Sequence, residues 1–142
     1  MLGALNFSVK EIRKELGLSQ SELADLVGIG SRAIQSYEQE WRQPPEMVER
    51  MLLLLLIAHR NGAELPQLRC WEKKECSSSV RQKCIAYKTR LGHLCWFLTG
   101  TMCEGQRQNT LADKLQLCLD CCFMKDLLNP TAFKTENSST LR

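Results

Sequence analysis

Residues 16–38 carry the pattern that decides the fold of the N-terminal half, and they read LGLSQSELADLVGIGSRAIQSYE. Ser19 with Glu22 three positions later is a capping box, so a helix is expected to begin directly after Ser19. This helix is expected to bury Leu23, Ala24, Leu26 and Val27 and to end at Gly28. Another helix is predicted from near Ser31, with Ile34 and Tyr37 packed inward. Two short helices joined by a glycine turn predict a helix-turn-helix arrangement.

Two further helices are expected beside this pair. Ser8 can cap an earlier helix, which Gly17 is expected to end. A proline pair at 44–45 can open a later helix, because proline is tolerated in the first turn. The later helix is apolar on every face over residues 51–57. A surface helix shows only an apolar stripe, so this helix is expected to be covered on several sides. We expect a partner subunit to supply part of the cover, which makes the chain a homodimer.

The N-terminal pattern resembles the phage-repressor (Xre/Cro-type) helix-turn-helix family over residues 7–58. The residues that carry the resemblance are Leu16-Gly17-Leu18-Ser19-Gln20-Ser21-Glu22-Leu23-Ala24, Gly28-Ile29, Ile34, Tyr37-Glu38 and Pro44. The resemblance implies a double-stranded DNA operator as partner, with the third helix in the major groove. It implies the DNA-binding residues Gln20, Ser31, Arg32, Gln35, Ser36 and Arg42.

Three of these positions have a stated chemical role. Arg32 is expected to read a base, because a guanidinium matches the two acceptors of guanine. Gln20 and Arg42 are expected to contact the DNA backbone. One position departs from the family: Glu40 stands where a glycine is usual, in a turn that favours positive φ. We expect Glu40 to cost of order 1 kcal/mol there.

Cysteine usage divides the chain. All 8 cysteines of the 142 residues lie after residue 69. We therefore predict a DNA-binding domain at 1–62, a cysteine-rich module at 63–128 and a flexible tail at 129–142, with a turn or linker at 61–66. No export signal or membrane-spanning run is recognisable, so a cytoplasmic, reducing location is expected, where cysteines serve as metal ligands or redox groups rather than as disulfides. The net charge of +3 decides nothing about partners.

The C-terminal half resembles a second family, the "two-CW" cysteine module, which occurs alone, after sensor domains and behind helix-turn-helix domains, mainly in anaerobic bacteria. The matching residues are Cys70-Trp71-Glu72, Cys76, Arg81, Cys84-Ile85-Ala86-Tyr87, Gly92-His93, Cys95-Trp96, Gly100-Thr101, Cys103, Gly105 and the pair Cys118-x-x-Cys121. Seven cysteines belong to the motif and are the candidate metal ligands: Cys70, Cys76, Cys84, Cys95, Cys103, Cys118 and Cys121. Cys122 lies outside the motif. The tryptophan that follows Cys70 and the one that follows Cys95 are expected to shield a sulfur site from water.

Several metal chemistries fit these residues. Thiolates hold either zinc or an iron–sulfur cluster. We favour a cluster, expected as [4Fe-4S], because seven sulfurs exceed the needs of one zinc site and zinc has no redox chemistry. Zinc remains the alternative, since the seven cysteines with His93 could close two tetrahedral sites. In a third, metal-free alternative, the oxidisable thiols are those of Cys118, Cys121 and Cys122.

The sequence thus predicts a mainly α protein: a helical repressor-like domain and a small metal-stapled module. The expected function is DNA-binding transcription regulation with an iron–sulfur centre that senses redox, oxygen or metal state. The alternative is a constitutive DNA-binding or interaction protein with structural zinc. We expect no enzyme, because no acid–base pair, phosphate loop or thioredoxin-like pattern surrounds the cysteines.

Overall fold

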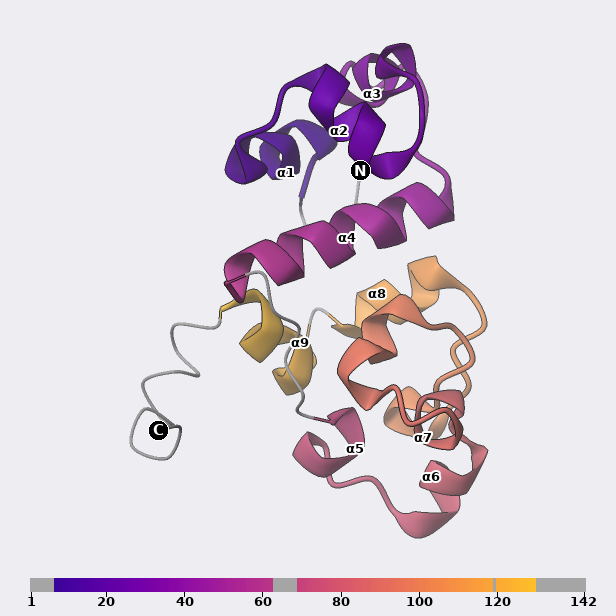
Figure 1. Ribbon diagram of the computed structural model, residues 1–142. Coiled ribbons are helices and arrows are strands. Elements are labelled where there is room, and N and C mark those ends of the chain that lie inside the picture. Colours follow the sequence, from indigo (N-terminus) through magenta and orange to yellow (C-terminus); the bar gives the residue numbers. More distant parts are fainter. Residues whose placement is uncertain (1–6, 63–68, 119, 130–142) are drawn as a thin grey trace. The chain divides into compact units, whose positions relative to one another are not determined.

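The computed structural model describes residues 7–62, 69–118 and 120–129, and over these ranges the chain is mainly helical, as predicted (Figure 1). The chain divides into two compact units, Met1–His59 and Arg60–Arg142. No strand is formed within the described ranges, although an isolated antiparallel bridge joins Thr101 and Gln108. None of the described helices is long and apolar enough to cross a bilayer.

The first two helices begin and end with the predicted signals. Helix α1 (Val9–Leu16) and helix α2 (Gln20–Val27) both start with a reciprocal capping box, in which serine and glutamate satisfy each other's backbone N–H groups. Gly17 ends α1 at φ 72°, and Gly28 ends α2 at φ 86°. Both turns need a left-handed residue, which glycine adopts without a Cβ penalty.

Helix α3 (Ser31–Glu38) completes the helix pair and packs on α1 and α2. Its buried residues are Ile34 and Tyr37, as expected from the sequence. The prediction that Leu26 is buried with the rest of α2 is wrong, because its side chain is 52% exposed. Leu26 lies on the outward face of α2, whereas its neighbours Leu23 and Ala24 enter the core.

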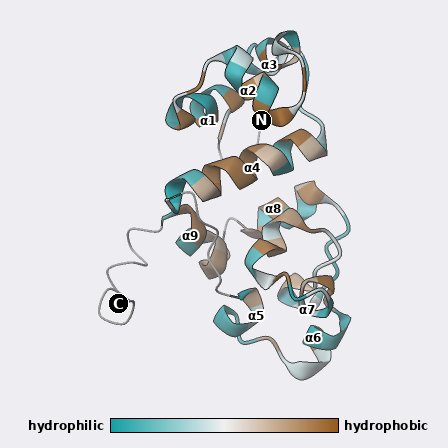
Figure 2. Ribbon diagram, in the orientation of Figure 1, coloured by the Kyte–Doolittle hydropathy of each residue, from teal (hydrophilic) through white to brown (hydrophobic). Residues whose placement is uncertain are grey.

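Helix α4 (Glu46–Arg60) follows the proline pair. Its buried residues are Val48, Leu52, Leu53, Leu56 and Ile57, and Figure 2 shows its apolar middle. Helix α4 is nevertheless not buried along its whole length, because the side chain of Met47 in the first turn is 65% exposed. Within the turn or linker predicted at 61–66, Asn61 and Gly62 form a turn, and the remaining positions lie outside the described residues. The same holds for the predicted tail beyond Asn129.

The second unit is built from short helices. In chain order they are α5 (Cys70–Lys73), α6 (Ser78–Lys83), α7 (Ile85–Lys88), the 3-10 helices η2 (Gly92–Phe97) and η3 (Cys103–Gly105), α8 (Leu111–Cys118) and α9 (Cys122–Leu128). Helices α5, α7 and α8 pack on η2. Helices of three to eight residues are not stable alone in water, so tertiary contacts must hold this unit together.

The apolar core of the second unit contains both tryptophans. Trp96 is fully buried beside Phe97, and Trp71 packs edge-on against Tyr87 with ring centroids 5.0 Å apart. Gly92 allows this arrangement, because a Cβ at that position would lie 2.5 Å from a ring carbon of Trp71. The motif glycine therefore makes room for the first tryptophan.

Candidate nucleic-acid interface and candidate metal centre

Helix α3 presents a polar face opposite its buried one. Ser31, Arg32 and Gln35 are exposed there, and Ser36 is half-buried. The Ser36 hydroxyl donates to the carbonyl of Arg32 over 3.0 Å, so its proton is used within the helix and its oxygen remains available as an acceptor. The exposed side chains are of the types that read base edges in a major groove.

Gln20 lies at the first position of α2 and is held by a charged pair that was not predicted from the sequence. Its amide Nε2 donates to Glu38 Oε2. The other oxygen of Glu38 accepts from Arg13 Nε at 2.5 Å, and Arg13 also donates to the carbonyl of Leu18. The Glu38 side chain is only 4% exposed. These contacts fix the orientation of the Gln20 amide at the N-terminal end of α2.

The chain after α3 places Arg42 over an aromatic ring. Its guanidinium carbon lies 5.5 Å from the centroid of Tyr37, a cation–π distance. Glu40 has φ 60°, which confirms the predicted left-handed turn at that position. An acidic side chain therefore occupies a strained position two residues before Arg42.

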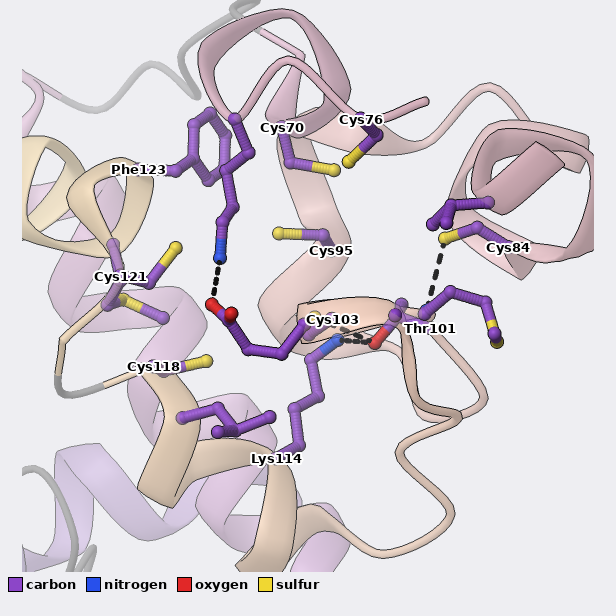
Figure 3. A pocket seen from close by; sticks show the side chains of 17 residues that line it. Cys70, Cys76, Cys84, Cys95, Thr101, Cys103, Lys114, Cys118, Cys121 and Phe123 are labelled. Atoms are coloured by element: carbon purple, nitrogen blue, oxygen red, sulfur yellow. Dashed lines mark hydrogen bonds and ion pairs between the residues drawn. The ribbon is translucent and has the colours of Figure 1, made fainter. Parts of the chain in front are cut away.

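The second unit contains a cavity of about 220 Å³, and Figure 3 shows the side chains around it. A cavity needs only about 10–15 Å³ of such space to hold one water molecule, so this cavity has room for far more than one small ion. All seven motif cysteines line this cavity: Cys70, Cys76, Cys84, Cys95, Cys103, Cys118 and Cys121. Cys122 does not line it and is exposed. The cavity, called the cysteine cavity below, thus gathers thiols that are up to 51 positions apart in the sequence.

Two of these thiols are hydrogen-bonded to each other. Cys70 begins α5 and Cys95 lies in η2. The hydrogen bond from Cys95 lowers the pKa of Cys70, whereas the hydrogen bond with Cys70 and burial raise the pKa of Cys95. In this pair the Cys70 thiol therefore loses its proton more readily than the Cys95 thiol.

The C-x-x-C pair spans the end of one helix and the start of the next. Cys118 is the last residue of α8, and Cys121 is the N-cap of α9. Burial raises the pKa of Cys118 to about 12. A metal that binds there must displace this proton.

Polar groups reach the sulfur atoms from the loop around η3. The backbone N–H of Met102 donates to Cys84 Sγ over 3.5 Å, and Thr101 Oγ1 lies 3.4 Å from Cys103 Sγ. Hydrogen bonds of this kind stabilise charge on sulfur and tune metal centres. At the cavity wall, Lys74 Nζ pairs with Glu104 Oε1 at 3.0 Å.

Three expectations about the cysteine module need correction or qualification. Neither tryptophan lines the cysteine cavity; the apolar lining comes instead from Val80, Met102, Leu117, Phe123 and Met124. His93 does not line it either, which removes the eighth ligand from the two-zinc arrangement. In the ranges that the structure describes, no three His, Cys, Asp or Glu side chains are gathered closely enough to hold one metal ion. The seven thiols therefore surround an open cavity and do not converge on one point.

Comparison with known proteins bears on the N-terminal unit. Residues 9–52 match the helix-turn-helix family model. The match covers α1, α2, α3 and the start of α4, so this part of the chain is similar to a helix-turn-helix domain. The matched range ends before the cysteine-rich unit. No curated protein and no solved structure matches the chain.

Proposed function

We propose that this protein is a DNA-binding transcription regulator whose C-terminal unit holds an iron–sulfur cluster and responds to redox, oxygen or metal state. The observation that carries the proposal is the cysteine cavity, in which every motif cysteine faces one shared space while Cys122 stays outside. An all-sulfur donor set of this size suits soft metals.

The fit between the cavity and a cluster rests on size and donor type. The lining contains seven thiols and one carboxylate, that of Glu104, which is already paired with Lys74. A single zinc ion needs four ligands that converge on one point, whereas these thiols are spread around about 220 Å³. The spread favours a polynuclear centre over one ion.

Four of the seven cysteines would suffice for a [4Fe-4S] centre. Cys118 and Cys121 are the first pair we assign, because their spacing lets both sulfurs reach one metal site. Cys70 and Cys95, which are already hydrogen-bonded neighbours, form the second pair. A bound cluster supplies a one-electron couple and a group that oxygen can attack. The chain's own residues bind it, limit water with apolar side chains and donate hydrogen bonds to sulfur.

The helix-turn-helix domain would read a paired operator as a homodimer. Helix-turn-helix domains recognise half-sites about one helical turn apart, so a change in the cysteine-rich unit that alters the spacing of two domains would alter operator affinity. The exposed side chains of α3, with Arg32 foremost, are the proposed base readers. Gln20 and Arg42 are the proposed backbone contacts.

The second candidate is a constitutive DNA-binding or interaction protein with structural zinc. The C-x-x-C pair favours it, since this spacing is common in structural zinc sites. The iron–sulfur protein and the zinc protein would differ in visible colour and in their iron, sulfide and zinc contents.

The test is purification without oxygen, followed by a visible spectrum and by iron, sulfide and zinc counts. We expect a brown protein with iron and sulfide in equal amounts. The double variant Cys118→Ser with Cys121→Ser should lose the metal, and Cys122→Ser is the matched control that should keep it. A colourless protein with one or two zinc ions would replace the cluster proposal with the zinc alternative.

The regulatory part needs a separate test. Operators are first selected from random duplex DNA with the anaerobic protein, and binding is then compared by mobility shift under nitrogen and in air. Weaker or stronger binding in air supports sensing. Equal binding in both conditions, with iron lost in air, would refute it.

A further inference from the structure

A lysine is fully buried in the wall of the cysteine cavity. Lys114 lies in the middle of α8 and is 0% exposed, although lysine is among the residues least often buried completely. Its Nζ donates to Thr101 Oγ1 over 2.6 Å, and Thr101 is itself buried (Figure 3). The ammonium group is therefore fixed in place rather than free to turn toward solvent.

This lysine has no acidic partner in the part of the chain that the structure describes. Its one hydrogen-bond acceptor there is a neutral hydroxyl, and no carboxylate lies within ion-pair distance. A buried ammonium without a negative partner is costly. The groups able to supply negative charge are the thiols that line the same cavity as Lys114.

The second lysine of the cavity is different. Lys74 is paired with Glu104, and its side chain is 25% exposed. The glutamate offsets its charge, and water screens it. Lys114 therefore contributes the larger uncompensated positive charge to the cavity.

We propose that Lys114, held by Thr101, is a specificity-determining residue that selects an anionic thiolate–metal centre and raises its reduction potential. This inference rests on the proposed function. One-electron reduction adds one negative charge to the bound centre and breaks no bond, so a fixed cation in a water-poor cavity favours the reduced form.

The test compares reconstituted full-length proteins in an anaerobic redox titration followed by visible spectroscopy. Lys114→Met removes the charge and keeps the length of the side chain, whereas Lys114→Arg keeps the charge. We expect Lys114→Met to favour the oxidised form on the order of tenfold relative to wild type, a fall of about 59 mV in midpoint potential for one electron. Lys114→Arg should stay near wild type, and Lys88→Met, which changes an exposed lysine of the same unit, should match it.

An unchanged midpoint in Lys114→Met at full iron content would overturn the proposal, as would an equal fall in Lys114→Arg. If Lys114→Met loses its iron while Lys114→Arg retains it, the requirement for charge is supported. If both variants fail to fold, Lys114→Gln decides, because it removes the charge and keeps a polar side chain beside the Thr101 hydroxyl. A lowered midpoint in Lys114→Gln supports the proposal, and an unchanged one overturns it.

Failure of the proposed function would be recognised separately, because wild-type protein would then contain no iron or sulfide. In that case the zinc forms of wild type and Lys114→Met are compared by competition with a colorimetric chelator. A roughly tenfold weaker retention of zinc in the variant supports the role of Lys114 as a countercharge, since four thiolates around zinc are also anionic. Equal retention would overturn it.

Discussion

Arg13 Nε lies 2.5 Å from Glu38 Oε1, and this pair joins the first helix to the third inside the N-terminal unit. The second oxygen of Glu38 accepts from Gln20, so one carboxylate connects the first three helices of the N-terminal unit. The orientation of a proposed DNA contact thus depends on an ion pair that is largely buried.

Glu38→Gln is expected to destabilise the protein by about 3 kcal/mol, because it leaves the Arg13 guanidinium without its charged partner in a half-buried position. Urea unfolding followed by circular dichroism measures the effect. The double variant Arg13→Met with Glu38→Leu should recover most of the loss, since it removes both charges. If Glu38→Gln is as stable as wild type, the Arg13–Glu38 ion pair contributes little to the free energy of unfolding.

Glu40→Gly is expected to stabilise the protein by about 1 kcal/mol, because glycine adopts the left-handed conformation without a Cβ penalty. The same change removes an acidic side chain two residues before Arg42, so DNA affinity should rise as well. Thermal unfolding and binding to selected operators measure the two effects. Glu46→Gly is a control in a helical position, where glycine should lower stability. A loss of stability in Glu40→Gly would contradict the strain argument.

Arg32→Ala is expected to cost about 1–3 kcal/mol of specific DNA binding, because a bidentate contact to guanine would be lost. The measurement is a titration of selected operators and of scrambled duplexes at fixed salt. Lys10→Ala, which changes an exposed residue of α1, is the matched control. If Arg32→Ala lowers the affinity for both duplexes equally, Arg32 contacts phosphate rather than a base.

Gly92→Ala is expected to destabilise the C-terminal unit by about 1–3 kcal/mol through overpacking. The added Cβ would meet two ring carbons of Trp71 at 2.5 and 2.9 Å and the Cys70 backbone nitrogen at 3.1 Å. Tryptophan fluorescence during unfolding reports the change directly. Gly30→Ala is the control, because a Cβ there meets no atom within 4 Å. Equal stability of the two variants would show that the ring moves aside at no cost.

The cysteines of the metal-free, reduced protein are expected to react with iodoacetamide over different pH ranges. The thiolate is the reactive form, the pKa of Cys70 is lowered, and burial raises the pKa of Cys118 to about 12. Cys70 should therefore be alkylated at lower pH than Cys118, and Cys118 should react only as the pH approaches 12. Mass spectrometry of the peptides at each pH gives both curves. Coincident curves would contradict the assigned environments.

The N-terminal helices could be predicted from sequence because their signals are local. The caps at Ser8 and Ser19 and the glycines that end α1 and α2 act within a few residues, and the structure shows them at the expected places. The link from Arg13 to Glu38 could not be found in the same way, because it joins positions 25 apart through tertiary packing. Nothing in the residues around either one indicates the pairing.

The grouping of the seven motif cysteines could be predicted from the sequence, whereas the surroundings of these cysteines could not. Spacing and resemblance separated seven cysteines from Cys122, and the cavity makes the same division. The shielding role expected of the tryptophans was wrong, because both indoles pack in the core. Lys114 resembles an ordinary surface lysine of an amphipathic helix, and only the packed structure reveals its burial.

The walls of the cysteine cavity come from six separate short segments between Cys70 and Met124, so any occupant acts as a crosslink among pieces that have little stability of their own. Losing that crosslink would lower the barrier to local opening throughout the unit rather than at one loop. A protease that cleaves opened chains would then remove the empty protein faster than the filled one. If the proposed centre binds, the amount of the protein would itself become a measure of how much metal centre is being made.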